Sequence, residues 1–372
     1  RMKICCDRAK FLEAFQVVAS VAPSRSPKAI LQNVKIEATE KVVVLSATDL
    51  EIGIRCEVAG VVVQVPGSAV VPVTRFGGIL RETPDEQLEI EADNQGTQVR
   101  AQRSVFKLPG INPEEFPDVA SFKDDAYHQI SACFLKEVIH RTIFATDNES
   151  SRYALGGVLL ELGEQELVAV GTDGRRLAKM QGPSESVGGH KTDGATTIVP
   201  TRALQLIDRA VSDNEEQVKI SSHQNDILVQ SEHVTIYARL VEGRFPNWRD
   251  VFPSQEDNIK IALPVGPFYS AVRQAAIVTS EESRGIDFTF GEGNAVLVGE
   301  ASETGQSRIE LPIEYRGDPV TLMLDPKYMA DFLKVLDDDK TFSLEVKDGK
   351  SAAVCLTDDG YGYVIMPMAR DR

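Results

Sequence analysis

Residues 171–177, Gly-Thr-Asp-Gly-Arg-Arg-Leu, decide the fold of this chain. They follow an apolar run at 167–170, and Thr, Asp and Gly are residues that tight turns favour, so the pattern predicts strand, turn, strand. A second stretch has the same order, because the apolar run 42–45 leads to Thr48-Asp49 and then to more apolar residues. The two copies stand about one domain length apart, which indicates a duplicated domain and not a short solenoid unit.

Composition is that of an ordinary globular protein. The chain has 372 residues, of which 42% are hydrophobic and 26% charged, enough for two or three domains with proper cores. No apolar run reaches the ~18 residues of a membrane helix, and no signal peptide opens the chain. The five cysteines lack Cys-x-x-Cys spacing, which predicts reduced thiols and a cytoplasmic location. The formal charge of −16 argues against a surface coated for nucleic acid, although it allows one restricted basic face.

The order helix, strands, helix, strands recurs three times. Pro72, Pro200 and Pro326 each stand where a second helix is expected, and proline is tolerated there because its missing N–H has no partner in the first helical turn. We therefore predict an α+β fold of three tandem repeated domains with antiparallel sheets. The predicted domains are residues 1–123, 124–256 and 257–372. The predicted helices cover residues 8–19, 131–145, 268–278 and the segments that follow the three prolines.

Spacing also predicts which side chains share a face. Phe134 and Val138 are one helical turn apart, so we expect both on the apolar face of their helix. The last strand is expected at 363–368, where Met366 and Met368 have the same parity and would point to one face.

No enzyme constellation is found. The chain has no P-loop, no Gly-x-Ser-x-Gly and no His-Glu-x-x-His motif, and its five histidines lack metal-ligand spacing. We expect no catalytic residue, no metal site and no cofactor. Asp49 and Asp173 could form a carboxylate pair, but Asp is so common in turns that hydrogen bonding within each corner is favoured by roughly four to one.

Basic residues are frequent in the predicted helices. Most helices carry lysine and arginine on an exposed face, so each one alone indicates only a solvated surface. If all the helices faced one way, the same residues would form a basic lining. They are Lys10, Arg75, Arg81, Lys136, Arg141, Arg202, Arg209, Arg273, Lys327 and Lys334.

Three motifs in combination resemble a known family. They are the turn at 172–177, Gly-Arg-Phe-Pro-Asn at 243–247 and Tyr-Val-Ile-Met-Pro-Met at 363–368. With the three tandem domains, they are similar over essentially the whole chain to the bacterial DNA polymerase sliding clamp, the β subunit of polymerase III. The resemblance implies a head-to-tail homodimeric ring, with two helices per domain on the inner wall around duplex DNA and sheets outside. Because electrostatic attraction to DNA is local, a basic lining and an acidic exterior can coexist.

The resemblance also implies a function and partners. The chain would be a processivity factor without an active site, which tethers the replicative polymerase to double-stranded DNA without sequence specificity and is opened by a clamp loader. Repair polymerases, mismatch-repair proteins and ligase are further partners it implies, and a membrane is not.

The implied site residues fall into three groups. The expected DNA contacts are Arg25, Arg75, Arg152, Tyr153 and Arg202. The expected partner-peptide pocket consists of Leu155, Thr172, Gly174, Arg176, Leu177, Pro246, Val251, Tyr328, Val364, Met366, Pro367 and Met368. The expected dimer interface consists of Phe106, Leu108, Ile277 and Val278.

Two alternatives stay open at the level of sequence. One is a clamp paralogue dedicated to repair. The other is a β-rich hydrolase with Asp49 and Asp173 as its acid and base.

Overall fold

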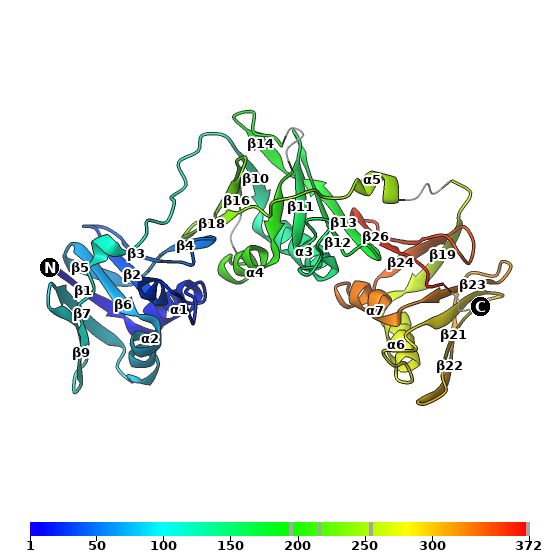
Figure 1. The fold of residues 1–372 in the computed structure, drawn as a ribbon, viewed down its shortest axis with the longest axis horizontal. Helices are drawn as coiled ribbons and strands as arrows, with labels where there is room; N and C mark the ends of the chain where they lie inside the picture. Colours follow the sequence, from blue (N-terminus) through cyan, green and yellow to red (C-terminus); the bar gives the residue numbers. More distant parts are fainter. Residues whose placement is uncertain (193–195, 215–216, 253–255, 370–372) are drawn as a thin grey trace. The chain divides into compact units, whose positions relative to one another are not determined.

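A computed structural model describes residues 1–192, 196–214, 217–252 and 256–369. The chain forms two compact units (Figure 1). Unit 1 consists of Arg1–Lys136, Ser184–Ala195 and Arg202–Leu240, and unit 2 consists of Glu137–Pro183, Thr196–Thr201 and Val241–Arg372.

Unit 1 contains two antiparallel sheets, with strand orders β5-β1-β7-β8-β9 and β14-β10-β16-β17-β18-β4-β3-β2-β6. Its strands are β1 (Met2–Asp7), β2 (Asn33–Ala38), β3 (Val43–Thr48), β4 (Ile52–Glu57), β5 (Val61–Val65), β6 (Gly67–Pro72), β7 (Gln87–Asp93), β8 (Gly96–Arg100), β9 (Val105–Pro109), β10 (Tyr127–Ser131), β14 (Glu185–Val187), β16 (Gln217–Ser222), β17 (Asp226–Gln230) and β18 (Val234–Arg239). Its helices are α1 (Arg8–Ala19), α2 (Val73–Glu82) and α4 (Thr201–Ala210), with short 3-10 helices at Ala29–Gln32 and Pro113–Glu115. Helix α3 (Ala132–Thr142) begins in unit 1 and ends in unit 2.

Unit 2 likewise contains two antiparallel sheets, with strand orders β15-β11-β12-β13-β26-β25-β24-β19 and β22-β21-β20-β23. Its strands are β11 (Gly157–Leu162), β12 (Glu166–Thr172), β13 (Arg176–Pro183), β15 (Ile198–Pro200), β19 (Ile259–Pro264), β20 (Ile286–Gly291), β21 (Asn294–Ala301), β22 (Gly305–Pro312), β23 (Val320–Leu324), β24 (Thr341–Val346), β25 (Ala353–Leu356) and β26 (Tyr361–Ile365). Its helices are α5 (Trp248–Val251), α6 (Val265–Ala276) and α7 (Pro326–Lys334), with a 3-10 helix at Ile143–Ala145.

One motif, a strand followed by a helix and three strands, recurs along the chain and begins at β1, β6, β10, β15, β19 and β23. The predicted repeat of helix and strands is therefore confirmed. Pro72 and Pro200 end the strands before α2 and α4, and Pro326 is the first residue of α7. Each proline thus stands at a helix start, where no intrahelical N–H is lost.

The core of unit 1 joins α1 to α2. Asp7 caps α1 by accepting a hydrogen bond from the Lys10 amide at 3.0 Å. The rings of Phe11 and Phe15 then pack on Phe76 of α2, with centroids 6.0 and 5.2 Å apart. All three rings are buried, so this cluster fixes the two helices against each other.

In unit 2, Phe332 of α7 forms the centre of an aromatic cluster. Its ring lies 5.3 Å from Phe342, 5.4 Å from Tyr361 and 5.1 Å from Tyr363. The Tyr363 hydroxyl donates to the Tyr328 carbonyl at 2.8 Å, so the last strand is tied to α7. These contacts hold one side of the candidate site rigid.

Two expectations about side-chain faces are corrected. In α3 the large apolar side chains that are buried are Leu135, Val138 and Ile139, whereas Phe134 is half-buried. The last strand ends at Ile365 and not at residue 368, because the chain leaves the ladder after that residue.

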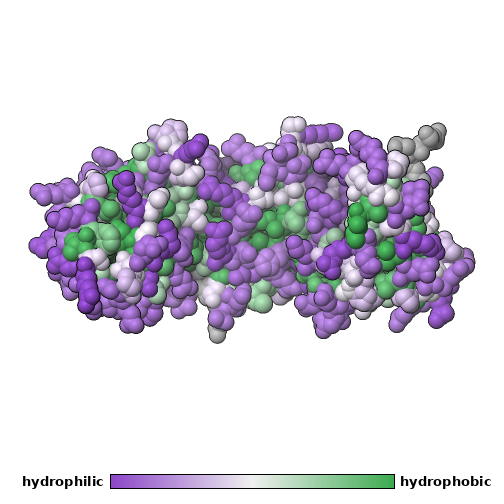
Figure 2. All heavy atoms as spheres, turned by 90° about the horizontal axis from the view of Figure 1, so that it is seen from below, coloured by the Kyte–Doolittle hydropathy of each residue, from purple (hydrophilic) through white to green (hydrophobic). Residues whose placement is uncertain are grey.

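Polar side chains dominate the face drawn in Figure 2, and apolar ones appear in smaller patches between them. In the parts of the chain that the structure describes, no helix is long and apolar enough to span a membrane. Cys6, Cys56 and Cys355 are buried and Cys133 is exposed, and none of the five cysteines is in a disulfide.

Candidate functional site

The corner at 172–176 is closed by its own side chains. The Thr172 hydroxyl donates to the Arg176 carbonyl at 2.7 Å and accepts from the Gly174 amide at 3.1 Å. Asp173 Oδ1 accepts from the amides of Arg175 and Arg176 at 2.9 and 3.1 Å. Gly174 has a φ of 88°, a left-handed conformation that glycine adopts without strain. The turn is therefore rigid, and it presents Arg175 outward.

The corner after β3 repeats this geometry bond for bond. Thr48 donates to the Ile52 carbonyl at 2.8 Å and accepts from the Leu50 amide at 2.9 Å, and Asp49 Oδ1 accepts from the Ile52 amide at 2.7 Å. Leu50 has a φ of 78°, where the other corner has glycine. The interpretation of both aspartates as turn residues is confirmed.

Next to the 172–176 corner lies a small apolar groove, with a volume of about 70 Å³. Leu177 of β13 stands directly opposite Val364 of β26, so both side chains leave the sheet on the same face. Pro246 and Val251 form the facing wall, and Met366 lies at the open end. The groove is lined by Thr172, Gly174, Arg175, Arg176, Leu177, Pro246, Val251, Val364 and Met366.

The facing wall belongs to a segment at 241–252, which we call the strap. Trp248 of the strap donates its indole N–H to Glu161 at 2.6 Å, and Arg249 pairs with the same carboxylate at 2.8 Å. The Ala154 amide donates to the Arg244 carbonyl at 2.9 Å. Glu161 thus fixes the strap, and with it one wall of the groove.

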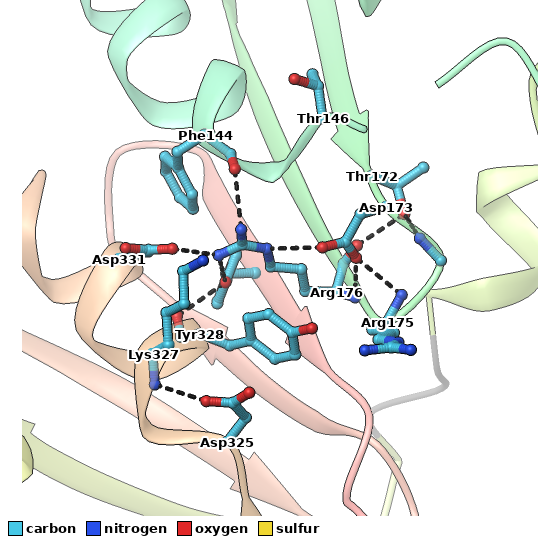
Figure 3. A network of polar contacts seen from close by, with 12 residues as sticks. Phe144, Thr146, Thr172, Asp173, Arg175, Arg176, Asp325, Lys327, Tyr328 and Asp331 are labelled. Carbon is cyan, nitrogen blue, oxygen red and sulfur yellow. Dashed lines mark hydrogen bonds and ion pairs between the residues drawn. The ribbon is translucent and has the colours of Figure 1, made fainter. Parts of the chain in front are cut away.

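Arg176, which lines the groove, is also the centre of a network of polar contacts (Figure 3). Its guanidinium donates to Asp173 at 3.2 Å, to Asp331 at 2.6 Å and to the Phe144 carbonyl at 3.0 Å, and it lies 4.6 Å from the Tyr328 ring centroid. Burial alone would lower the pKa of Arg176, but Tyr363 and Asp331 outweigh burial and raise it. Since its donors are used within the chain, Arg176 positions the groove.

The chain beyond β26 runs away from the groove after one residue. The Met366 amide donates to the Arg175 carbonyl at 3.0 Å, and its side chain is 45% exposed. The Met368 amide instead donates to the Met323 carbonyl at 2.8 Å, at the edge strand β23. The expectation that both methionines share one strand face is therefore wrong, because neither lies in the strand.

The other residues expected in the pocket do not line the groove itself. Leu155 is buried in the apolar cluster that contains Leu177 and Val364. Tyr328 lies beside Arg176, while Pro367 and Met368 lie past the groove. Sequence reasoning did not place Arg175 in the groove, although its position inside the predicted turn was a usable signal.

The residues expected at DNA are distributed over both units. In unit 1, Arg25 and Arg75 are exposed, and the Arg202 guanidinium contacts both Asp49 and the Val21 carbonyl. In unit 2, exposed Arg152 lies over the Tyr153 ring at 5.1 Å. Arg202 is therefore less available to a phosphate than Arg25 or Arg75.

Two of the basic helix residues have structural roles. Arg141 is 8% exposed and pairs with Glu137 at 2.6 Å and Asp359 at 2.9 Å. Lys136 donates to the Val211 carbonyl at 2.9 Å and pairs with Asp213 at 3.0 Å. The other eight are exposed and remain candidates for a basic lining.

The residues expected at a dimer interface lie at exposed edges. Phe106 and Leu108 are half-buried on β9, the edge strand of the five-stranded sheet. Ile277, the residue that follows α6, is 78% exposed, and Val278 after it is half-buried.

Three family models match the chain end to end. They describe the N-terminal, central and C-terminal domains of the DNA polymerase III beta subunit, and they match residues 2–120, 129–247 and 249–369. The chain belongs to the beta sliding clamp family. It is a sliding clamp of DNA polymerase III, a non-catalytic processivity subunit that acts with the polymerase and DNA.

The relatives of this clamp match it over nine-tenths or more of their length. The beta sliding clamp of Chlamydia pneumoniae is 30% identical, with 99% of each chain covered. That of Staphylococcus aureus is 29% identical, with 91% of each chain covered. The crystal structure of the sliding clamp from Pseudomonas aeruginosa bound to griselimycin has a TM-score of 0.91 at 26% identity, covering 99% of this chain and 100% of that one. A Bacillus subtilis clamp has the same fold, with a TM-score of 0.92 at 24% identity and full coverage of both chains.

The hydrolase alternative is wrong for this clamp. The family is non-catalytic, and each of the two aspartates is used by its own turn. Asp49 also pairs with Arg202, and Asp173 with Arg176, so neither carboxylate is held ready for proton transfer.

Proposed function

We propose that the groove of unit 2 receives a short peptide from the replicative polymerase and from the clamp loader. The observation that carries this proposal is the exposure of large apolar side chains at a groove. Val251 and Met366 are each 45% exposed, whereas Leu177 and Val364 beneath them are buried. Apolar surface gathered in a concave site is typical of a place where another molecule binds.

The chemistry of the walls fits peptides of varied sequence. Methionine is flexible and polarisable, so Met366 can adapt to different apolar anchors. Burying one leucine or phenylalanine contributes roughly 1.5–3 kcal/mol. Micromolar binding requires about 8 kcal/mol, so two anchors and some backbone hydrogen bonds are needed.

Calorimetry with a Gln-x-x-Leu-Phe peptide tests the groove, and Met368 supplies a matched control. We expect Met366→Ala to weaken binding about five- to thirtyfold, the effect of losing 1–2 kcal/mol of apolar contact. Met368→Ala removes the same side chain two residues away, outside the groove, and should leave the affinity unchanged. Equal affinity of wild type and Met366→Ala would place the peptide elsewhere.

We further propose that two chains close head to tail into a ring around duplex DNA. In this arrangement Phe106 and Leu108 of one chain meet Ile277 and Val278 of the other. Exposed apolar side chains at an edge strand are an aggregation hazard unless a partner covers them, which supports such an interface. A clamp dedicated to repair would use the same ring, and a pull-down with the replicative polymerase separates the two roles.

A further inference from the structure

The groove has one exposed cation at its rim. Arg175 and Arg176 are the cations among its lining residues, and the Arg176 guanidinium is buried among internal acceptors. Arg175 is exposed and stands at the tip of the rigid corner. An apolar groove beside an exposed guanidinium has the features expected of a site for a peptide with an apolar anchor and a nearby anion.

We propose that Arg175 selects partner peptides that carry an aspartate or glutamate next to the apolar anchor. This inference rests on the proposed function of the groove as a peptide site. The guanidinium of Arg175 is positively charged and planar, and both properties favour a carboxylate. The planar fork of arginine binds the two carboxylate oxygens side by side.

The carboxylates near Arg175 also serve the fold. Asp173 accepts through Oδ1 from two backbone amides and through Oδ2 from Arg176. Asp325 is buried and accepts from the Lys327 amide at 2.9 Å, capping α7. Both contribute negative potential around Arg175. A partner carboxylate would therefore bind the guanidinium beside them.

Tyr328 orients the guanidinium. Figure 3 shows the Tyr328 ring with its hydroxyl turned toward Arg175. A hydrogen bond with this hydroxyl, followed by the charge of Asp173 and Asp325, raises the pKa of Arg175 against the effect of burial. One hydroxyl cannot use all five N–H donors of arginine, so donors remain for a ligand.

The backbone of Arg175 is held beside the groove. Its amide donates to Asp173 and its carbonyl accepts from the Met366 amide at 3.0 Å. The main chain of residue 175 is therefore fixed next to Met366, which also lines the groove. A fixed main chain reduces the entropy lost when a peptide binds. Because both backbone bonds survive a change of side chain, substitutions of Arg175 should leave the turn intact.

Fluorescence polarisation with capped peptides and the whole 372-residue chain tests the inference. All peptides carry the same Leu-Phe anchor, and the neighbouring residue on either side is Glu, Gln or Lys. We expect wild type to prefer the better Glu peptide over Gln by about three- to fivefold, the upper part of the range for an exposed charge pair, and to bind Lys more weakly than Gln. The preference should shrink as salt is raised from 0.15 to 0.5 M, since added ions screen the contact.

Three variants separate the effect of the Arg175 side chain from that of the rest of the groove. Arg175→Gln should bring the Glu and Gln peptides within twofold of each other while leaving the affinity for the Gln peptide unchanged. Arg175→Glu should invert the order, so that the Lys peptide binds best. Arg316→Gln removes an exposed arginine of unit 2 that does not line the groove, and it should behave as wild type.

The results distinguish the role of Arg175 from the role of the groove as a peptide site. Micromolar binding of the Gln peptide with no charge preference in wild type would overturn the role of Arg175 and leave the peptide groove standing. A preference for Glu that persists in Arg175→Gln would also overturn it. If none of the capped peptides binds wild type, the groove itself is not the peptide site.

Discussion

A single backbone conformation is shared by two unlike residues in this clamp. Leu50 and Gly174 both stand at the left-handed position of the same turn, with φ of 78° and 88°. For an L-residue other than glycine this conformation costs roughly 1–2 kcal/mol. The corner of Thr48 and Asp49 nevertheless forms, because its side-chain hydrogen bonds hold Leu50 in place. The threonine and the aspartate, and not the glycine, therefore specify the turn.

Two buried histidines in unit 1, His128 and His190, are expected to make the unfolding free energy depend on pH. His128 Nδ1 and His190 Nδ1 are 2.6 Å apart, and the Ser222 amide donates to His190 Nε2 at 3.0 Å. Burial, with smaller contributions from His128 and His223, lowers the pKa of His190 below 6.5, against the opposing charge of Asp124. The folded state therefore resists protonation at a pH where the unfolded chain accepts a proton.

Because the pKa of His190 is lower in the folded state than in the unfolded chain, low pH destabilises the folded state. The contribution of His190 is fully present above pH 6.5 and is lost as pH falls from 6.5 toward its lower folded pKa. Each unit of pKa difference is worth about 1.4 kcal/mol. We expect the loss in unfolding free energy between pH 7.5 and 5.5, measured in urea, to be smaller in His190→Gln than in wild type.

His233→Gln is the matched control for this measurement, since that imidazole is 56% exposed. It replaces the same side chain outside the buried pair, so its difference from wild type should be smaller than that of His190→Gln. His223 acts in the opposite direction, because after the cost of burial its bonds to Asp226 and Asp124 raise its pKa. Equal slopes for wild type and His190→Gln would contradict the prediction.

At the scale of elements, the strap contributes Pro246 and Val251 to the groove. Trp248 is the one tryptophan of the chain, so its fluorescence reports directly on the strap. We expect Glu161→Gln to increase acrylamide quenching of this fluorescence and to weaken peptide binding a few-fold, because the charged acceptor of Trp248 and Arg249 is lost. Glu310→Gln, which breaks an exposed pair with Arg308, should change neither. Unaltered quenching in Glu161→Gln would show that the strap is held by packing alone.

At the scale of the whole molecule, ring closure is expected to depend on a few apolar contacts. Leu108→Ala combined with Ile277→Ala should weaken the dimer at least thirtyfold, since truncating two interface side chains removes roughly 2 kcal/mol or more. Sedimentation at low protein concentration measures this shift. Val62→Ala truncates an exposed residue on β5, the opposite edge of the same sheet, and should leave the dimer intact. A double variant that sediments as wild type would exclude this interface.

Retention on DNA should depend on topology more than on affinity. A loaded clamp is expected to stay on closed circular DNA and to slide off linear ends, because nonspecific phosphate contacts are weak and sensitive to salt.

Arg75→Ala should reduce direct DNA binding more than Arg202→Ala, since the Arg202 guanidinium is already engaged by Asp49. Gel-shift titrations at 50 and 150 mM salt measure both effects. A complex that survives high salt on linear DNA would contradict the sliding model.

The sequence by itself determined the repeated architecture. Helix starts, turn residues and apolar periodicity each depend on a few neighbouring residues. They predict local structure correctly wherever local preference and tertiary packing agree. The Asp7 cap, the two Thr-Asp corners and the three prolines at helix starts are all of this kind.

Tertiary structure decided the features that depend on residues far apart in the chain. Arg141 belongs to the core because Asp359, more than two hundred positions away, pairs with it, and no local pattern encodes that contact. Met366 lines the groove and Met368 does not. The last strand ends at Ile365, the Met366 amide then donates to the Arg175 carbonyl, and the Met368 amide donates to the Met323 carbonyl. Arg175 likewise becomes a rim cation only when the strap and the last strand meet beside its turn. Periodicity fixes the face on which a side chain lies, whereas its partners are fixed only by the packing of the folded chain.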